Sequence, residues 1–141
     1  MFVSMSRKTI CLIIFVLLHL TASAQTQRQL NETATVSYKK ADTRLNVLYQ
    51  QVLKLYAKDT TFLKNFRASQ QAWLRFRDAQ VAALFPKQPN ENEMVTYGSI
   101  YPVCYYKAMQ ELTEARNRQL QVWVTGTDEG DACSGSVRTI R

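Results

Sequence analysis

The sequence predicts an all-α fold, an antiparallel bundle of three main amphipathic helices followed by a polar C-terminal tail. Apolar residues recur every three or four positions over long stretches, which is the spacing of one helix face and not the alternation of a β-strand. No glycine or proline interrupts the chain between Leu30 and Phe85. Three such helices joined by short connections bury their apolar faces only against one another, which predicts a bundle.

The first 24 residues have the composition of a secretory signal peptide. Arg7-Lys8 provides a positive start, an apolar run follows over 10–20, and Ala22-Ser23-Ala24 offers the small residues that a signal peptidase requires. The alternative is a membrane anchor, which needs about 20 apolar residues, and this run is shorter. We therefore expect cleavage after Ala24 and a protein that is periplasmic or extracellular.

The exported chain is expected to consist of a helical domain over 25–125 and a polar tail over 126–141. Removal of the signal peptide takes away His19, the only histidine. Without an imidazole the chain lacks the base of a Ser-His-Asp or Cys-His site and the commonest zinc ligand. Asp78 is the only acid expected on the second helix, so a paired-carboxylate hydrolase is not indicated. We expect no enzyme activity, no metal and no cofactor.

The chain is basic, with a formal net charge of +7 that falls to +5 when the two positive charges of Arg7-Lys8 are removed. The basic residues are spread over all three predicted helices. Nucleic-acid binding requires a clustered basic patch with a matching motif, so we do not expect it. A weak, non-specific contact with anionic envelope components is physically reasonable.

The first helix is expected to follow a loose polar lead-in over 25–34. The second is expected over 62–84, with Thr60 or Thr61 as its N-cap and a proline-containing loop over 86–98 behind it. The apolar stripe of the first helix consists of Ala41, Leu45, Leu48, Val52 and Leu55. The stripe of the second consists of Phe62, Phe66, Trp73, Phe76 and Ala83.

The third helix is expected from Ser99, its N-cap, to Gly126, where the helical pattern stops. Pro102 then lies in the first turn, where its missing N–H costs nothing. The apolar stripe of this helix consists of Tyr101, Tyr105, Ala108, Leu112, Ala115 and Val122.

Two cysteines, Cys104 and Cys133, remain after export. In an oxidising compartment two cysteines more often pair than stay free. Their disulfide would close a loop of about 28 residues, contribute roughly 3–4 kcal/mol and tie the tail to the third helix. The alternative is that Cys133 is free or pairs between chains.

A set of polar residues lies on or beside the apolar stripes. Because a buried charge needs a partner, we expect Asp42 or Asp78 to pair with Arg77 or Arg116. The set forms either an internal network that fixes the helix register, which we prefer, or a docking patch. Its members are Asp42, Asn46, Tyr49, Gln70, Trp73, Arg77, Asp78, Thr113 and Arg116.

The same residues, in the same order, resemble a known family. The blocks are Ala41-Asp42-x-x-Leu45-Asn46-x-x-Tyr49, Gln70-x-Ala72-Trp73-x-x-x-Arg77-Asp78, Gly98-Ser99-Ile100-Tyr101 and Leu112-Thr113-x-x-Arg116. Over roughly Tyr38 to Trp123 the chain resembles the LprI-like lysozyme inhibitor domain. The resemblance implies an exported helical binding module whose partner is a lysozyme-like wall-degrading enzyme.

The resemblance also bears on the cysteines and on the contact surface. Relatives usually carry a cysteine shortly after the Arg-Asp of the second helix, where this chain has Asp78-Ala79-Gln80, so Cys133 is a candidate replacement partner for Cys104. Animal-type lysozymes are strongly basic, and complementary charge favours acidic contacts. The candidates are Glu91 and Glu93 in the loop over 86–98, or Asp128, Glu129 and Asp131 in the tail. The alternative function is an envelope-associated structural or scaffolding protein without inhibitory activity. The sequence leaves the oligomeric state open.

Overall fold

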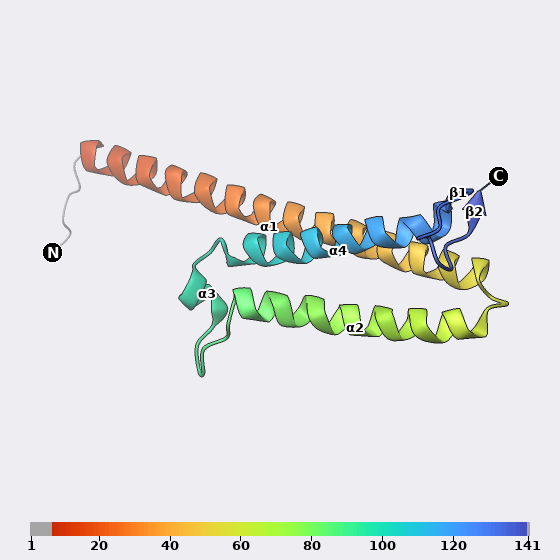
Figure 1. Cartoon of the computed structure of the whole chain (residues 1–141). Helices are drawn as coiled ribbons and strands as arrows, with labels where there is room; N and C mark the ends of the chain where they lie inside the picture. Colours follow the sequence, from red (N-terminus) through yellow and green to blue (C-terminus); the bar gives the residue numbers. More distant parts are fainter. Residues whose placement is uncertain (1–6, 141) are drawn as a thin grey trace.

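The computed structural model describes residues 7–140, and the side chains of residues 26–140. Within the described residues the long helices are α1, α2 and α4, so the prediction of an all-α fold with three main helices is confirmed (Figure 1). The elements in chain order are α1 (Arg7–Leu55), α2 (Thr60–Leu84), α3 (Glu93–Tyr97), α4 (Tyr101–Thr125), β1 (Thr127–Asp128) and β2 (Thr139–Ile140).

The prediction of a signal peptide falls on residues 1–24, and both the first six residues and all side chains of this stretch lie outside the described part. The predicted loose lead-in is wrong, because residues 26–34 continue α1 without a break. Pairs four residues apart support this polar helix: Gln27 Nε2 donates to Asn31 Oδ1 at 2.9 Å, and Arg28 lies 3.3 Å from Glu32. No helix in the described residues is long and apolar enough to cross a membrane.

Helix α2 runs antiparallel to α1 and α4, whereas α1 and α4 run parallel to each other (Figure 1). The ring contacts between α1 and α4 follow the same direction in both helices, with Tyr38 on Tyr106 at 5.8 Å and Tyr56 on Trp123 at 5.9 Å. The backbones of α1 and α4 also pack more closely than any other pair of helices. The predicted antiparallel bundle is therefore not confirmed as stated, because its main interface joins parallel helices.

The core lies where the second half of α1, the first half of α2 and the end of α4 meet. The predicted stripe of α1 is buried except for Leu55, which is 47% exposed. The predicted stripe of α2 is wrong at Phe76, which is 54% exposed, and at Ala83, which is also exposed. The buried hydrophobic cluster consists of Leu45, Leu48, Val52, Phe62, Leu63, Phe66 and Leu120.

The predicted apolar stripe of α4 is wrong, because the structure buries a different face of this helix. Its last member, Val122, is 43% exposed, whereas Leu120 is fully buried. Polar residues interrupt the face of α4 that is buried in the structure, so the sequence of this face lacks a continuous apolar pattern. Small polar side chains fit there because the backbones of α1 and α4 approach closely. The buried residues of α4 are Met109, Thr113, Asn117 and Leu120.

The helix caps differ in part from prediction. Helix α2 is capped by Asp59, whose Oδ1 accepts a hydrogen bond from the backbone N–H of Phe62 at 2.8 Å. Helix α4 has Ile100 at its N-cap position without a side-chain hydrogen bond, so Ser99 does not cap it, whereas Pro102 lies in the first turn as expected. The region predicted as a plain loop contains the short helix α3.

The tail folds back on the end of α4. Strands β1 and β2 pair in parallel, with Thr127 opposite Thr139. Gly126, at φ 88°, makes the turn possible. A Cβ at Gly126 would lie 2.6 Å from the carbonyl oxygen of Arg138, so only glycine allows this approach.

Cys104 and Cys133 are both free, so the predicted intrachain disulfide is not formed. Helix α4 separates them, because at about 1.5 Å per residue it carries the chain about 33 Å from Cys104 to Gly126. The tail then stays near that end through its pairing with β1. A disulfide requires Cα atoms less than about 7 Å apart, and this geometry does not provide that distance.

Candidate functional site

Arg77 joins α2 to α1 and is only 8% exposed. Its Nε donates to Asp78 Oδ1 at 2.9 Å, and its Nη2 lies 2.9 Å from the same oxygen. Its Nη1 lies 3.5 Å from Asp42 Oδ1, an ion pair whose geometry is not that of a hydrogen bond. Asn46 donates to the other oxygen of Asp42 at 3.5 Å, the outer limit of such a bond. Both predicted acids therefore converge on Arg77.

Arg116 joins α4 to α2 through neutral partners. Its Nε donates to Gln70 Oε1 at 3.1 Å, its Nη2 to Ser69 Oγ at 3.1 Å and its Nη1 to Gln119 Oε1 at 3.0 Å. No carboxylate lies within ion-pair distance of Arg116 in the part of the chain whose side chains are described. Burial lowers the pKa of this guanidinium, because water that would solvate the charge is excluded.

Trp73 lies between the two arginines. The guanidinium carbon of Arg77 is 5.4 Å from the centre of its ring and that of Arg116 is 5.9 Å away, both within cation–π range. This arrangement holds α2 against both of its neighbours. We call the six residues of this arrangement the polar belt: Asp42, Gln70, Trp73, Arg77, Asp78 and Arg116.

The structure brings together most, but not all, of the predicted polar residues. Tyr49 stacks on Phe66 at 5.6 Å and belongs to the core. Thr113 is fully buried, and its hydroxyl donates to the carbonyl of Met109 in its own helix at 2.7 Å, so it takes no part in the belt. A pocket of about 230 Å³ between α1 and α2 is lined by Asp42, Asn46, Tyr49, Gln70 and Arg77, among others.

The side chains of the polar belt are engaged with one another, and the belt presents no nucleophile next to a base. Within the described residues no group of three His, Cys, Asp or Glu side chains is placed to hold a metal ion. This arrangement can fix the register of three helices, and its exposed edge can contact a partner.

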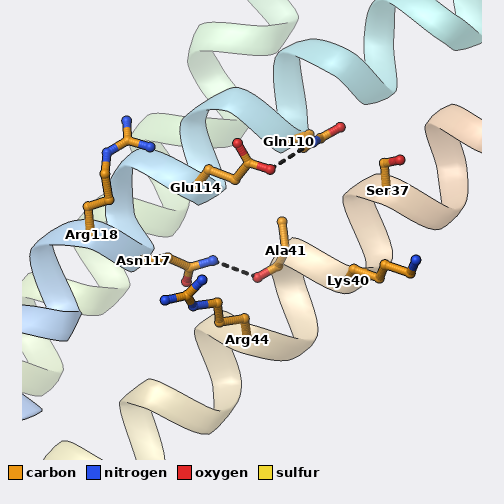
Figure 2. A pocket seen from close by; sticks show the side chains of 8 residues that line it. All are labelled: Ser37, Lys40, Ala41, Arg44, Gln110, Glu114, Asn117 and Arg118. Carbon is orange, nitrogen blue, oxygen red and sulfur yellow. Dashed lines mark hydrogen bonds between the residues drawn. The ribbon is translucent and has the colours of Figure 1, made fainter.

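A basic groove of about 490 Å³ lies between α1 and α4 (Figure 2). At its floor Asn117 donates to the backbone carbonyl of Ala41 at 2.9 Å. The sequence does not predict this groove, because its cations belong to two helices and only the packing of α1 on α4 brings them together. The charged residues that line it are Lys40, Arg44, Arg118 and Glu114.

The loop between α2 and α4, residues 85–100, contains the predicted acidic contacts Glu91 and Glu93. Glu93 lies 3.4 Å from Lys87, and a hydrogen bond from its own backbone N–H together with Lys87 lowers the pKa of the Glu93 carboxyl. Glu91 accepts a hydrogen bond from the hydroxyl of Thr96 at 2.8 Å and has no cationic partner among the described residues. The side chain beside them, Val95, is 77% exposed.

Aromatic residues fix this loop, which we call the α3 loop, at the end of the bundle (Figure 1). Phe85 lies edge-on to Tyr97 at 5.6 Å and to Tyr101 at 5.5 Å. Tyr97 also donates its hydroxyl to the carbonyl of Pro86 at 2.7 Å. The loop therefore presents Val95 and Glu91 from a base held by ring contacts.

Comparison with known protein families matches residues 20–120 to the family described as "Lysozyme inhibitor LprI". Comparisons with curated proteins and with solved structures gave no match. The matched range contains the whole polar belt and the α3 loop, and it ends before the tail. Since it covers well over half of the 141 residues, the chain belongs to the lysozyme inhibitor LprI family.

Proposed function

We propose that this chain is an exported binding module that inhibits a lysozyme-like wall-degrading enzyme, and that the α3 loop is its contact. Family membership supports the inhibition. The observation that carries the contact is the exposure of Val95, which at 77% is the highest among the exposed large hydrophobic residues of the described chain. An exposed apolar side chain on a projecting loop that also carries Glu91, a carboxylate without a cationic partner among the described residues, suits insertion into a basic cleft.

Export by cleavage after Ala24 is part of this proposal. Such cleavage would leave the polar belt and the α3 loop whole. Among the residues whose side chains are described, those of α1 that contact α2 and α4 through rings or ion pairs begin at Tyr38, well beyond the cleavage point. The exported chain would therefore keep the contacts that hold the bundle together.

Charge decides how such a complex would form. The exported chain is basic overall, at +5 once Arg7 and Lys8 are removed from the total of +7, so its long-range interaction with a basic lysozyme is repulsive. The α3 loop carries Lys87, Glu91 and Glu93 and is locally acidic. Local attraction then acts only over short distances, and moderate salt should speed association by screening the long-range repulsion.

The test is titration of the exported protein against an animal-type lysozyme, with binding heat and wall-lysis rate both measured. We expect saturable one-to-one binding and loss of lysis. Glu91→Gln and Val95→Ser should each raise the concentration needed for half-inhibition by about tenfold, as expected for residues at the centre of an interface. The amide oxygen that Glu91→Gln introduces would still accept the hydrogen bond from Thr96, so the loop should stay folded.

Two matched controls separate the loop from general effects of charge and hydrophobicity. Glu111→Gln removes the same charge from an exposed position of α4, and Val47→Ser removes an apolar side chain that is 51% exposed on α1. Both should inhibit like the unchanged protein. Absence of binding at micromolar concentrations would refute the inhibitory function, and full inhibition by both loop variants would refute the contact.

The basic groove favours a second candidate, a structural protein of the envelope that holds anionic polymers. Lys40, Arg44 and Arg118 face only one acid, Glu114, around the groove. Binding of an anionic wall polymer to this groove should weaken steeply as salt is raised from low to physiological concentration. Sedimentation with purified wall material at several salt concentrations measures this. Binding that is insensitive to salt would rule the mechanism out.

A further inference from the structure

A pocket of about 470 Å³ opens between α2, the C-terminal half of α4 and the tail. Along α2 its wall is formed by one helix face, which includes Asn65 and Ser69. Ser69 contacts Arg116 at the inner end, and Asp59 lies at the other end. At about 1.5 Å per residue, the distance from Asp59 to Ser69 along α2 is about 15 Å. We call this cavity the Arg116 pocket.

Arg116 gives the pocket its charge. A guanidinium has five N–H donors, and three of those of Arg116 donate to Gln70, Gln119 and Ser69. Two donors are therefore left for an incoming acceptor. Arginine recognises carboxylates through such a pair of N–H groups. No other basic residue lines the pocket, so a single negative charge fits it better than a phosphate dianion.

The remaining walls combine aromatic rings with small polar groups. Trp123 lies 4.9 Å from Phe62 and 6.4 Å from Phe66, between ring centres, and all three line the pocket. Asn65 supplies an amide, and Asp59 keeps one carboxylate oxygen beyond the one that caps α2. A pocket of this size with apolar walls and a few polar groups is typical of small-molecule sites. A sugar ring has an apolar face for the rings and hydroxyl groups for the amide and carboxylate.

We propose that the Arg116 pocket binds an acidic sugar, a saccharide ring that carries a carboxylate. The carboxylate lies on the two free N–H groups of Arg116, the apolar face of the ring packs on Trp123, and hydroxyl groups reach Asn65 and Asp59. The pocket is lined by the start of α2, the second half of α4 and the tail, and the start of α2 and the tail lie at the end of the bundle opposite α3 (Figure 1). The proposed sugar site is therefore separate from the proposed contact with lysozyme, and an experiment can refute either proposal without refuting the other.

The experiment compares N-acetylmuramic acid with N-acetylglucosamine, which differ by the carboxylate-bearing lactyl ether. Each sugar is titrated into the exported protein while tryptophan fluorescence is followed, with calorimetry as a second readout. The two tryptophans of the chain both report on this region, because Trp123 lines the pocket and Trp73 contacts Arg116. We expect the acid to bind at least about tenfold more tightly than the neutral sugar.

Substitutions locate the site. Asn65 is exposed, so Asn65→Asp places a repelling charge in the pocket without disturbing the core, and Gln80→Glu adds the same charge elsewhere on α2. Arg116→Gln removes the proposed carboxylate partner, and Arg118→Gln removes an arginine that faces the basic groove instead. The two pocket variants should bind the acid at least about tenfold more weakly, and the two controls should bind it like the unchanged protein.

Several results would overturn the proposal. Equal affinity for both sugars would exclude recognition of the carboxylate, and no saturation of either below about 10 mM would exclude a site of useful affinity. Equally tight binding of inorganic phosphate would identify a general anion site. Unchanged binding by a folded Asn65→Asp protein would place the ligand elsewhere. Inhibition of lysozyme by the same variant tests the proposed function separately and should be unaffected.

Discussion

Leu120→Ala should lower the free energy of unfolding by about 3–4 kcal/mol, as expected when a large aliphatic side chain is removed from a packed core. Leu120 is fully buried and belongs to the cluster in which all three long helices meet. The loss combines the transfer of the missing methyl groups with the cavity that remains, because a site enclosed by three helices cannot collapse freely. Urea unfolding followed by circular dichroism measures it.

Val122→Ala is the matched control on the same helix. Val122 is 43% exposed, so its truncation should change stability by less than about 0.5 kcal/mol. The pair of variants tests which face of α4 is buried. A large loss at Val122 together with a small loss at Leu120 would show that the stripe predicted from the sequence, and not the face seen in the structure, packs against α1 and α2.

Arg77→Ala should lower the free energy of unfolding by about 2–3 kcal/mol, mainly through packing. The Arg77 side chain is only 10% exposed, whereas those of Asp42 and Asp78 are 39% and 62% exposed. Water can therefore solvate the carboxylates of both acids after the guanidinium is removed. This limits the penalty to less than that of an acid left buried without a partner.

Arg77→Met separates packing from charge. Methionine keeps an unbranched side chain of similar length in the space beneath α2, and well-packed apolar replacements of buried ion pairs are often close to neutral. We expect a loss within about 1 kcal/mol for this variant. A loss as large as that of Arg77→Ala would show that the ion pairs, and not the buried stem, stabilise the belt.

The hydrophobic periodicity of the sequence was sufficient to predict the long helices, but it was not sufficient to predict which face of each helix is buried. The stripe of α1 was predicted at four of its five positions, because Ala41, Leu45, Leu48 and Val52 form an uninterrupted apolar repeat. On α4 two faces compete, one that is richer in tyrosine and one that contains Thr113 and Asn117. Apolar periodicity selects the first. The structure buries the second, because the close approach of α1 admits small side chains and Asn117 bonds to the carbonyl of Ala41.

The contacts of the polar residues were likewise predictable only in part. The need of a buried charge for a partner predicted that Asp42 or Asp78 pairs with Arg77 or Arg116, but it left the choice of arginine open, and the structure places both acids on Arg77. The neutral partners of Arg116 were not predictable, because Gln70 and Ser69 become its acceptors only through the position of α2 against α4. The disulfide was predicted from the oxidising compartment and from the family resemblance, neither of which contains information on the distance between Cys104 and Cys133 in this chain.

By itself the sequence determined that the chain is helical, that its second long helix ends before the prolines of residues 86–89, and to which family it belongs. These properties depend on local periodicity and on residues at fixed spacings. Only the tertiary structure decided that α1 and α4 run parallel, that Leu120 and not Val122 is in the core, and that Cys104 and Cys133 lie apart. It also decided that Arg116 has no acidic partner among the described residues, which creates the proposed sugar site. These properties depend on distances between helices, which hydrophobic periodicity within one helix does not specify.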